Sequence, residues 1–329
     1  MFDPGRRILV RVNRIIVLGM FGLACGGSGE SLPKPSSGSA PAAKPEVADP
    51  EPALPDPAAT KALADKACPR IVAPYYFRVE KAGKVSHMLG TRHMSVPFAK
   101  MPAIVKDELA KAKLVVLETV GDDDSDSATP DKPLSGLLGP KLWAKYKALV
   151  GEATATMLEG APPATAMVSL MMLYEDATAQ LDGEIEEAAK DANIELAGLE
   201  TSQFQDKLLG ELLDLRMLKA VLEGTPDRGM LRRESAEDIA EYCAGTGTDP
   251  GLDERTRTQL SAAGYSTAEI TRLDDRLLNE RNRDWLPKLE TMFANGDVFV
   301  VVGADHLIGP RGVIAMLAAR GFKTARVSR

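Results

Sequence analysis

The segment VFVVVGADH, residues 298–306, joins a short apolar run to the tetrapeptide pattern Gly-x-x-His. A second segment of the same kind, VSHMLGTRH, occupies residues 85–93. A short apolar run bounded by glycine predicts a buried strand, so His93 and His306 should each lie just past the carboxyl end of a strand. Ligands bind at that edge of an open α/β sheet, and histidine suits metal ligation or proton transfer near neutral pH. These two histidines are therefore the first candidates for a functional site.

Strands and helices are predicted to alternate along the rest of the chain. A glycine-containing turn at residues 81–84 joins the first two predicted strands in a hairpin. The predicted strands are residues 75–80, 85–89, 114–117, 194–199, 298–302 and 324–327, and the predicted helices near them are residues 99–112, 182–191 and 312–320. Strands separated by helices indicate an α/β fold with a mainly parallel central sheet, here with an N-terminal hairpin.

A helical insertion is predicted at about residues 202–295. Ser202-x-x-Gln205 and Ser266-x-x-Glu269 are capping-box signatures, each in front of periodic apolar positions. The apolar stripe at residues 208–221 indicates core packing more strongly than a partner-binding face. We expect this stretch to form a helical layer or cap above the sheet edge.

Residues 1–25 have the pattern of an export signal. Four arginines precede the apolar run 15–23, which is shorter than the roughly 20 apolar residues of a membrane span. Cys25 follows this run closely, as in a bacterial lipoprotein signal, although Gly22 stands where a branched aliphatic residue is usual. A plain secretory signal or an uncleaved anchor is the alternative. We expect an exported protein, periplasmic or at the outer membrane, that contacts the membrane through lipidated Cys25.

Residues 26–67 are predicted to be a disordered tether. The segment has no aromatic residue and no isoleucine, and proline recurs from Pro33 to Pro57. Such a sequence cannot bury enough apolar area to offset its conformational entropy. The folded domain is therefore expected to span residues 68–329.

Charge and cysteine content give two further expectations. The net charge of −7 argues against nucleic acid as a partner. Cys68 and Cys243 are the cysteines of the predicted domain, and paired thiols in an oxidising compartment tend to be bridged. We predict that these two cysteines form a disulfide.

Two carboxylates follow predicted strands in the same way as the histidines. Glu118 comes directly after residues 114–117, and Glu200 directly after residues 194–199. Because parallel strands end at one edge of a sheet, both should lie near His93 and His306. A helix cap or a solvated loop position is the alternative for either carboxylate, and it weighs more for Glu200.

Several motifs occur together over residue 75 to the end of the chain. They are SHMLGTRH (86–93), LE (117–118), LET (199–201) followed by Gln205, ERN (280–282) and VGADHLIGPRGV (302–313). With these motifs the chain resembles the TraB/GumN family, whose relatives include the Tiki metalloproteases and, more distantly, the haem-binding ChaN and erythromycin-esterase proteins. The resemblance implies metal-binding or catalytic positions at His93, Glu118 and His306, with Arg281 and Asn282 as polar groups that reach the same cleft.

Two residues depart from the usual family pattern. Arg92 stands where an aliphatic residue is common, and in the cleft it would weaken cation binding and favour an anionic substrate. Asp305 stands where a small residue is common. Beside His306 it is either a carboxylate that fixes the imidazole tautomer or a helix cap.

Other polar residues are assigned structural roles. His87 lies within a predicted strand, where a packed core histidine is favoured over a ligand. The acidic run 122–126 lacks the glycine and late glutamate of a calcium loop and is expected to be a solvated loop. Trp285 and Arg281 are one helical turn apart and are expected to stack.

The predicted activity is metal-assisted hydrolysis of a bond in a peptide or protein substrate. His93, Glu118 and His306 would hold a divalent ion, with Mn, Co and Zn all plausible, in a site open to water. Glu200 would act as base, and Arg281 would stabilise the developing oxyanion. The chain has no His-Glu-x-x-His helix, so it is not an ordinary zincin. The alternative is a non-catalytic binding protein that sequesters a peptide or haem in the same cleft.

Overall fold

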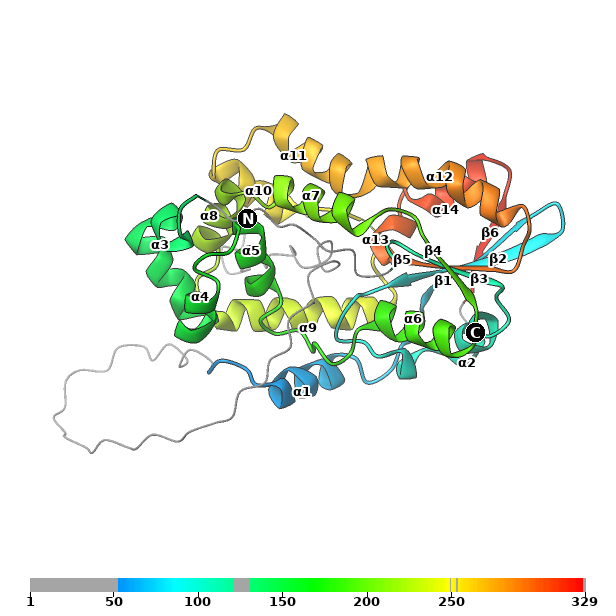
Figure 1. Ribbon diagram of the computed structural model, residues 1–329, viewed down its shortest axis with the longest axis horizontal. Helices are drawn as coiled ribbons and strands as arrows, with labels where there is room; N and C mark the ends of the chain where they lie inside the picture. The colour runs from blue at the N-terminus through cyan, green and yellow to red at the C-terminus, as the bar shows by residue number, and fades with distance from the viewer. Residues whose placement is uncertain (1–52, 121–130, 249, 253, 328–329) are drawn as a thin grey trace, which may run out of the picture.

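The computed structural model describes residues 53–120, 131–248, 250–252 and 254–327. These residues form one six-stranded sheet with helices on both faces and a helical layer at one end (Figure 1). The strands are β1 (Tyr75–Lys81), β2 (Lys84–Thr91), β3 (Leu114–Leu117), β4 (Glu195–Gly198), β5 (Val298–Gly303) and β6 (Lys323–Arg326). Their order across the sheet is β4-β3-β5-β2-β1-β6. β4, β3, β5 and β2 run parallel, whereas β1 is antiparallel to β2 and β6. The predicted fold class is confirmed.

The helices fall into two groups, those that cover the sheet and those that form the layer at its end. They are α1 (Pro57–Ala67), α2 (Ala103–Leu109), α3 (Leu134–Val150), α4 (Glu152–Met157), α5 (Pro163–Met171), α6 (Leu181–Asp191), α7 (Ser202–Leu212), α8 (Leu215–Gly224), α9 (Arg228–Ala244), α10 (Glu254–Ala262), α11 (Thr267–Asp274), α12 (Glu280–Phe293), α13 (Ala304–Leu307) and α14 (Val313–Ala319), with a 3-10 turn η1 (Phe98–Lys100) and a π-helical turn η2 (Asp275–Asn279). In Figure 1, α12 and α14 lie over one face of the sheet, and α2 and α6 lie over the other.

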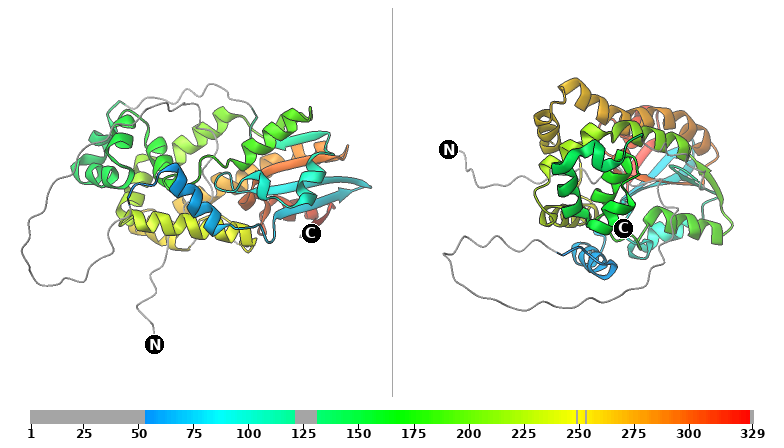
Figure 2. Two further views of the ribbon diagram at one scale, coloured as in Figure 1. Left: turned by 90° about the horizontal axis from the view of Figure 1, so that it is seen from below. Right: turned by 60° about the vertical axis from the view of Figure 1, so that its left-hand side comes forward.

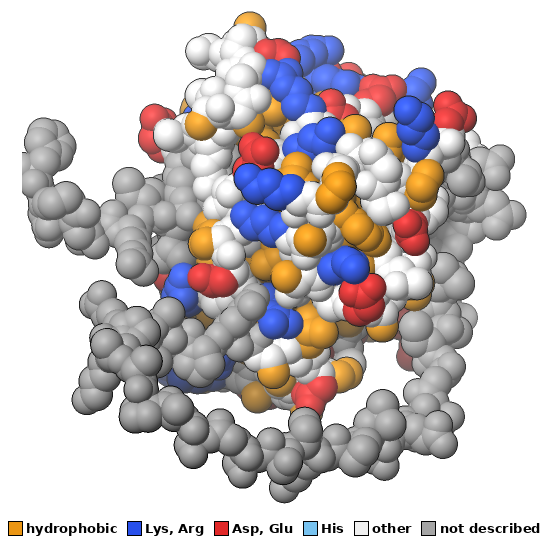
Figure 3. Space-filling view, turned by 90° about the vertical axis from the view of Figure 1, so that its left-hand side faces the viewer, with side chains coloured by type: hydrophobic (Ala, Val, Ile, Leu, Met, Phe, Trp, Pro, Cys, Tyr) orange, Lys and Arg blue, Asp and Glu red, His pale blue; other side chains and the backbone are white. Residues whose placement is uncertain are grey.

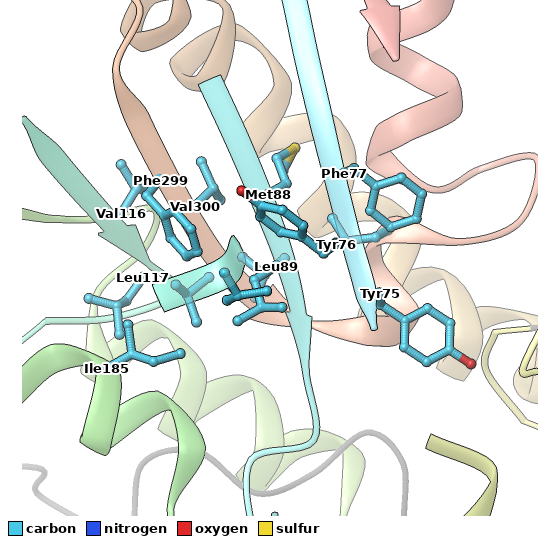
Figure 4. Packing of buried hydrophobic residues seen from close by; sticks show 14 of the residues in the cluster. Tyr75, Tyr76, Phe77, Met88, Leu89, Val116, Leu117, Ile185, Phe299 and Val300 are labelled. Carbon is cyan, nitrogen blue, oxygen red and sulfur yellow. The ribbon is translucent and has the colours of Figure 1, made fainter. Parts of the chain in front are cut away.

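The strands β3 and β5 are apolar throughout because both of their faces are covered. β5 is buried along its whole length. Val300 of β5 is in register with Met88 of β2 and with Val116 of β3, and the three pack in the core shown in Figure 4. Continuous burial explains why this strand has an unbroken apolar sequence and no alternation.

A second hydrophobic cluster fills the helical end of the molecule. It includes Leu149 of α3, Leu170 of α5 and Leu218 of α8. The long helix α9 links the two clusters, since Leu231 belongs to the helical cluster and Tyr242 to the cluster around the sheet. The views in Figure 2 show this layout, with the sheet at one end and the helical layer at the other. On the face shown in Figure 3, the helical end mixes basic, acidic and hydrophobic side chains, as on an ordinary protein surface.

The helical layer draws on more of the chain than the predicted insertion. α7 to α12 fall within residues 202–295, but α12 packs on the sheet and not in the layer. α3, α4 and α5 also belong to the layer, and the sequence did not predict them. Glycine and proline interrupt this region. Gly139 has a positive φ of 73° and is followed by Pro140, so α3 is kinked there. A glycine followed by a proline is a helix-breaking signal in a sequence, although the buried positions Leu134, Leu138, Leu142 and Tyr146 keep a four-residue spacing across the kink.

The predicted helix at residues 99–112 is shorter and broken. It begins as η1 and resumes as α2 after Pro102, which occupies the N-cap position of α2. Proline lacks an N–H and restricts the residue before it to extended conformations, so the two helical pieces cannot merge.

The predicted tether extends too far towards the domain, because residues 57–67 form α1. Asp56 caps this helix by accepting a hydrogen bond from the Ala59 N–H at 2.7 Å, and Pro57 occupies its first turn. Proline is tolerated there because that N–H has no helical partner. Cys68 follows the helix and forms a disulfide with Cys243 at the end of α9, which confirms the predicted pairing.

The remaining N-terminal predictions lie outside the described residues. These are the export signal, Cys25 and the first part of the tether, and the acidic run 122–126 is also outside. Within the described ranges, no helix combines the length and the apolar character needed to cross a bilayer.

Candidate metal centre

The carboxyl ends of the four parallel strands meet at one edge of the sheet, and each carries one predicted site residue. His93 lies two residues past β2 and Glu118 directly follows β3. Glu200 lies two residues past β4, and His306 lies in α13, three residues past β5. Because β2, β5, β3 and β4 are neighbours in the sheet, the structure brings together four residues that span most of the folded chain.

The glycine of the first Gly-x-x-His motif allows the two motifs to touch. A Cβ atom at Gly90 would lie 2.8 Å from Cα of Ala304 and 2.9 Å from Cβ of Tyr75. Such distances are too short for carbon atoms, so any side chain at Gly90 would push the two strand ends apart. This glycine therefore sets the close approach of β2 to α13.

The glycine of the second motif has a different role. A Cβ atom at Gly303 would lie 3.3 Å from Nε2 of His93, 3.4 Å from Oε1 of Glu118 and 3.6 Å from Cδ2 of His306. The backbone N–H of Gly303 also donates a hydrogen bond to Oε1 of Glu118 at 2.8 Å. The two histidines and the carboxylate thus surround the position that a side chain at residue 303 would occupy.

Arg281 of α12 binds the two carboxylates from the other side. Its side chain is 7% exposed. Nη2 donates to Oε2 of Glu118 at 2.5 Å and to Oε1 of Glu200, and Nε donates to the same oxygen of Glu200 at 2.9 Å. Nη1 donates to Nε2 of His306 and to the carbonyl of Leu277, each at 3.2 Å. Leu277 belongs to the π-helical turn η2, and such turns are frequent at functional sites.

Glu200 is further held by two neutral donors. Gln205 Nε2 donates to Oε1 of Glu200 at 2.8 Å and to Oε2 of Glu118 at 3.0 Å. Trp285 Nε1 donates to Oε2 of Glu200 at 3.0 Å, and the guanidinium of Arg281 stacks on its ring as predicted. Each oxygen of Glu200 therefore accepts at least two hydrogen bonds. This geometry suits a carboxylate that positions Arg281 better than one that takes a proton from water.

The outer ring nitrogen of each histidine is also held. Nδ1 of His93 is 2.8 Å from Oδ2 of Asp182, and Nδ1 of His306 is 2.6 Å from Oδ1 of Asn282. Both partners present acceptor oxygens, so each Nδ1 carries a hydrogen. Nε2 of His306 accepts from Nη1 of Arg281, and Nε2 of His93 borders Gly303 together with Oε1 of Glu118. An imidazole supported in this way can ligate a metal or accept a proton.

Burial and the nearby charges shift the pKa values of Glu118, His306 and His93 in different directions. Burial opposes the charged form of Glu118, but the charge of Arg281, the two histidines and the hydrogen bond from the Gly303 N–H together outweigh it and lower the pKa of Glu118 to about 2. Burial, together with Arg281, lowers the pKa of His306 to about 3, so this ring is neutral. Burial also opposes the charged form of His93, but the charge and hydrogen bond of Asp182, together with the charge of Glu118, outweigh it and raise the pKa of His93.

A divalent ion fits this set in donor type and direction. Two imidazole nitrogens and a carboxylate oxygen are usual ligands of such ions, and Oε1 of Glu118 is not used by Arg281. The set is not closed, however. Nε2 of His306 is 3.9 Å from Oε1 of Glu118 and contacts Arg281, and no three His, Cys, Asp or Glu side chains in the described ranges have metal-holding spacing. His306 would have to leave Arg281 to complete the site.

Other residues singled out in the sequence lie away from this convergence. His87 is within β2 and stacks on Tyr76, with ring centroids 5.4 Å apart, as expected of a packed core histidine. Arg92 turns away from the metal position and pairs with the buried Glu175 at 2.7 Å. Arg92 and Asp305 both line a cavity of about 30 Å³ between the motifs and α9. Nδ1 of His306 is hydrogen-bonded to Asn282, so Asn282 and not Asp305 fixes the tautomer of this imidazole.

Sequence reasoning missed Asp182. It was placed only at the start of a predicted helix, and an acidic residue in a first helical turn is common for reasons of the helix dipole alone. Only the packing of α6 against the end of β2 shows that its carboxylate lies on His93.

Comparison with protein families identifies one relationship. The model of the TraB/PrgY/gumN family matches residues 75–326, a span that contains the strand ends and the residues described above. Neither the curated proteins nor the solved structures give a match.

Proposed function

This chain belongs to the TraB/PrgY/gumN family, and we propose that it is a metal-dependent hydrolase that cleaves peptide bonds. The observation that supports the proposal best is the convergence of His93, Glu118 and His306 on the space beside Gly303. Two imidazole nitrogens and one ionised carboxylate oxygen around this position form a donor set suited to a divalent ion.

In this proposal the three side chains hold the ion through Nε2 of His93, Nε2 of His306 and Oε1 of Glu118. A bound divalent ion would supply Lewis acidity at the sheet edge, where it polarises a carbonyl and lowers the pKa of water. Glu118 can serve with one oxygen because its other oxygen is neutralised by Arg281. The Gly303 N–H fixes the direction of the ligating oxygen.

Arg281 and Glu200 act as a supporting pair in the proposed site. Glu200 holds the guanidinium of Arg281 through two of its nitrogens, and Arg281 in turn holds Glu118 and approaches His306. If His306 turned to a bound ion, Nη1 of Arg281, which donates to His306 here, would become available to stabilise negative charge on a substrate oxygen. Asn282 keeps the ring of His306 in the required tautomer.

Metal analysis with activity measurement tests the proposal. Protein purified without chelator should contain close to one divalent ion per chain and hydrolyse members of a fluorogenic peptide library, and chelator should abolish the hydrolysis. The His93→Ala, His306→Ala double variant should lose both properties. His87→Ala is the matched control, since His87 stacks in the sheet and should keep its metal.

The opposite result would favour another function. Equal metal in wild type and double variant would contradict the proposed site. Tight binding of a peptide or haem by metal-free protein, without turnover, would favour a sequestering protein in place of a hydrolase.

We also propose that the protein is exported and held at a membrane by an acylated Cys25. The basic and apolar pattern of residues 1–25 supports this, and so does the Cys68–Cys243 disulfide, since disulfides persist in oxidising compartments. Metabolic labelling with a fatty-acid probe should mark the wild type and not Cys25→Ser. Wild-type protein that takes up no label would contradict the lipid anchor.

A further inference from the structure

Asp182 connects three parts of the candidate centre. It lies in the first turn of α6 and is 7% exposed. Its Oδ2 is 2.8 Å from Nδ1 of His93, and its Oδ1 accepts a hydrogen bond from Oγ1 of Thr91 at 2.8 Å. Thr91 is the last residue of β2 and also lies 3.3 Å from the carbonyl of Val302 in β5. Thr91 therefore holds the carboxylate of Asp182 at the ends of β2 and β5, independently of the contact with His93.

The second histidine has a neutral counterpart to this arrangement. Oδ1 of Asn282 faces Nδ1 of His306 at 2.6 Å, and Nδ2 of Asn282 donates to the carbonyl of Arg311 at 3.1 Å. The Arg311 carbonyl accepts only from the nitrogen, which settles which end of the amide faces the ring. Both rings are thus held in the same tautomer, one by a charged oxygen and one by a neutral oxygen.

We propose that Asp182 is a positioning residue that makes His93 the stronger of the two histidine ligands. The inference rests on the proposed function, because it concerns metal binding by His93. A hydrogen bond from Nδ1 fixes the ring so that Nε2 faces Glu118, and an ionised acceptor also increases the electron density that Nε2 donates. Asn282 provides the first effect for His306 and not the second.

The charge and the hydrogen bonds of Asp182 can be separated by substitution. In Asp182→Asn, Oδ1 can still accept from Nδ1 of His93 and Nδ2 can donate to Oγ1 of Thr91, which then donates to the carbonyl of Val302. The shape and the contacts stay, and only the negative charge is lost. Asp191→Asn, at the exposed end of the same helix, is the matched control.

Metal affinity at pH 8, measured by competition with a chromophoric chelator using Zn²⁺ or Mn²⁺, is the first readout. Asp182→Asn should bind the ion about 10- to 100-fold more weakly, and Asp191→Asn should bind it as the wild type does. Melting temperatures in chelator should agree within a few degrees, which shows that the fold is intact. Wild-type affinity in folded Asp182→Asn would overturn the proposal, because the role of Asp182 would then be structural only.

Imidazole ¹⁵N spectra give a second readout that needs no metal. The chain has three histidines, and substitution of His87 and His306 assigns the signals. At a pH above the raised pKa of His93, where the ring is neutral, His93 should carry its hydrogen on Nδ1 in the wild type and should populate both tautomers in Asp182→Ala. A wild-type His93 with its hydrogen on Nε2 would overturn the proposal even if the protein bound no metal. Wild-type protein without metal affinity but with the expected tautomer would reject the hydrolase and, with it, the ligand role of His93, and only the orientation of the ring by Asp182 would stand.

Discussion

Replacing Arg281 by methionine should strongly destabilise the metal-free protein. The side chains of Arg281, Glu118 and Glu200 are only 7%, 3% and 7% exposed. Methionine fills much of the same volume but leaves two carboxylates buried without their cation. Removing one partner of a buried ion pair costs about 3–5 kcal/mol, because the remaining charge is uncompensated. We expect a loss of this size in the free energy of unfolding at pH 8.

The loss should depend on pH in a defined direction. Arg281 is the main reason that the pKa of Glu118 lies at about 2, below its ordinary value of 4.5. In the wild type this lowered pKa stabilises the folded protein above pH 4.5, and the contribution is lost as the pH falls towards 2. Without Arg281, burial raises the pKa of Glu118, so the folded variant takes up a proton more readily than the unfolded chain. The difference in the free energy of unfolding between wild type and Arg281→Met should therefore decrease from pH 8 to pH 5.

Urea unfolding followed by circular dichroism, in the presence of chelator, measures this effect. Arg272→Met is the control, because Arg272 and its partner Glu280 have side chains that are 61% and 33% exposed. An exposed pair of this kind is worth about 0–1 kcal/mol. A loss below about 1 kcal/mol for Arg281→Met at pH 8 would refute the reasoning. It would mean that the carboxylates are not held by the guanidinium in solution.

Three further outcomes follow from the structure. Gly303→Ala should lower metal affinity at least tenfold, about 1.4 kcal/mol, because its methyl group enters the space between the ligating atoms. This variant should melt near the wild-type temperature, whereas Gly90→Ala should unfold at a lower temperature. An unchanged zinc titration of Gly303→Ala would contradict the proposed metal site. Reduction of the Cys68–Cys243 disulfide, which closes a loop with a sequence separation of 175, should lower the free energy of unfolding by about 3–5 kcal/mol. Alkylation of both thiols in denatured, non-reduced protein would show that no disulfide exists. The pKa of His306 in the folded protein, about 3, lies below its ordinary value of 6.5, so stability falls as the pH drops below 6.5. Metal-free wild type should lose about 2 kcal/mol between pH 7 and pH 5 from this group, and an equal loss in His306→Gln would rule the group out as the cause.

The sequence by itself determined the strands, the fold class and the positions of the strand-end residues. The run VFVVVG predicted β5, and the Gly-x-x-His pattern placed His306 just beyond it. These features depend on the local order of side chains, because a strand buried on both faces must be apolar at every position. Glu118 and Glu200 followed from the same local rule once a parallel sheet was assumed.

The tertiary structure decided which groups meet at the strand ends. Gly303 and Glu118 are 185 residues apart in the chain, and His93 and Asp182 are 89 apart. Such contacts depend on the order of strands in the sheet and on the packing of α6 and α12, which no local pattern encodes. For this reason the sequence named Arg281, Glu118 and Glu200 but not the ion pairs between them, and it left Asp182 as an ordinary residue in the first turn of a helix. Side chains distant in the chain acquire a common chemistry only when the sheet and its covering helices bring them within hydrogen-bonding distance.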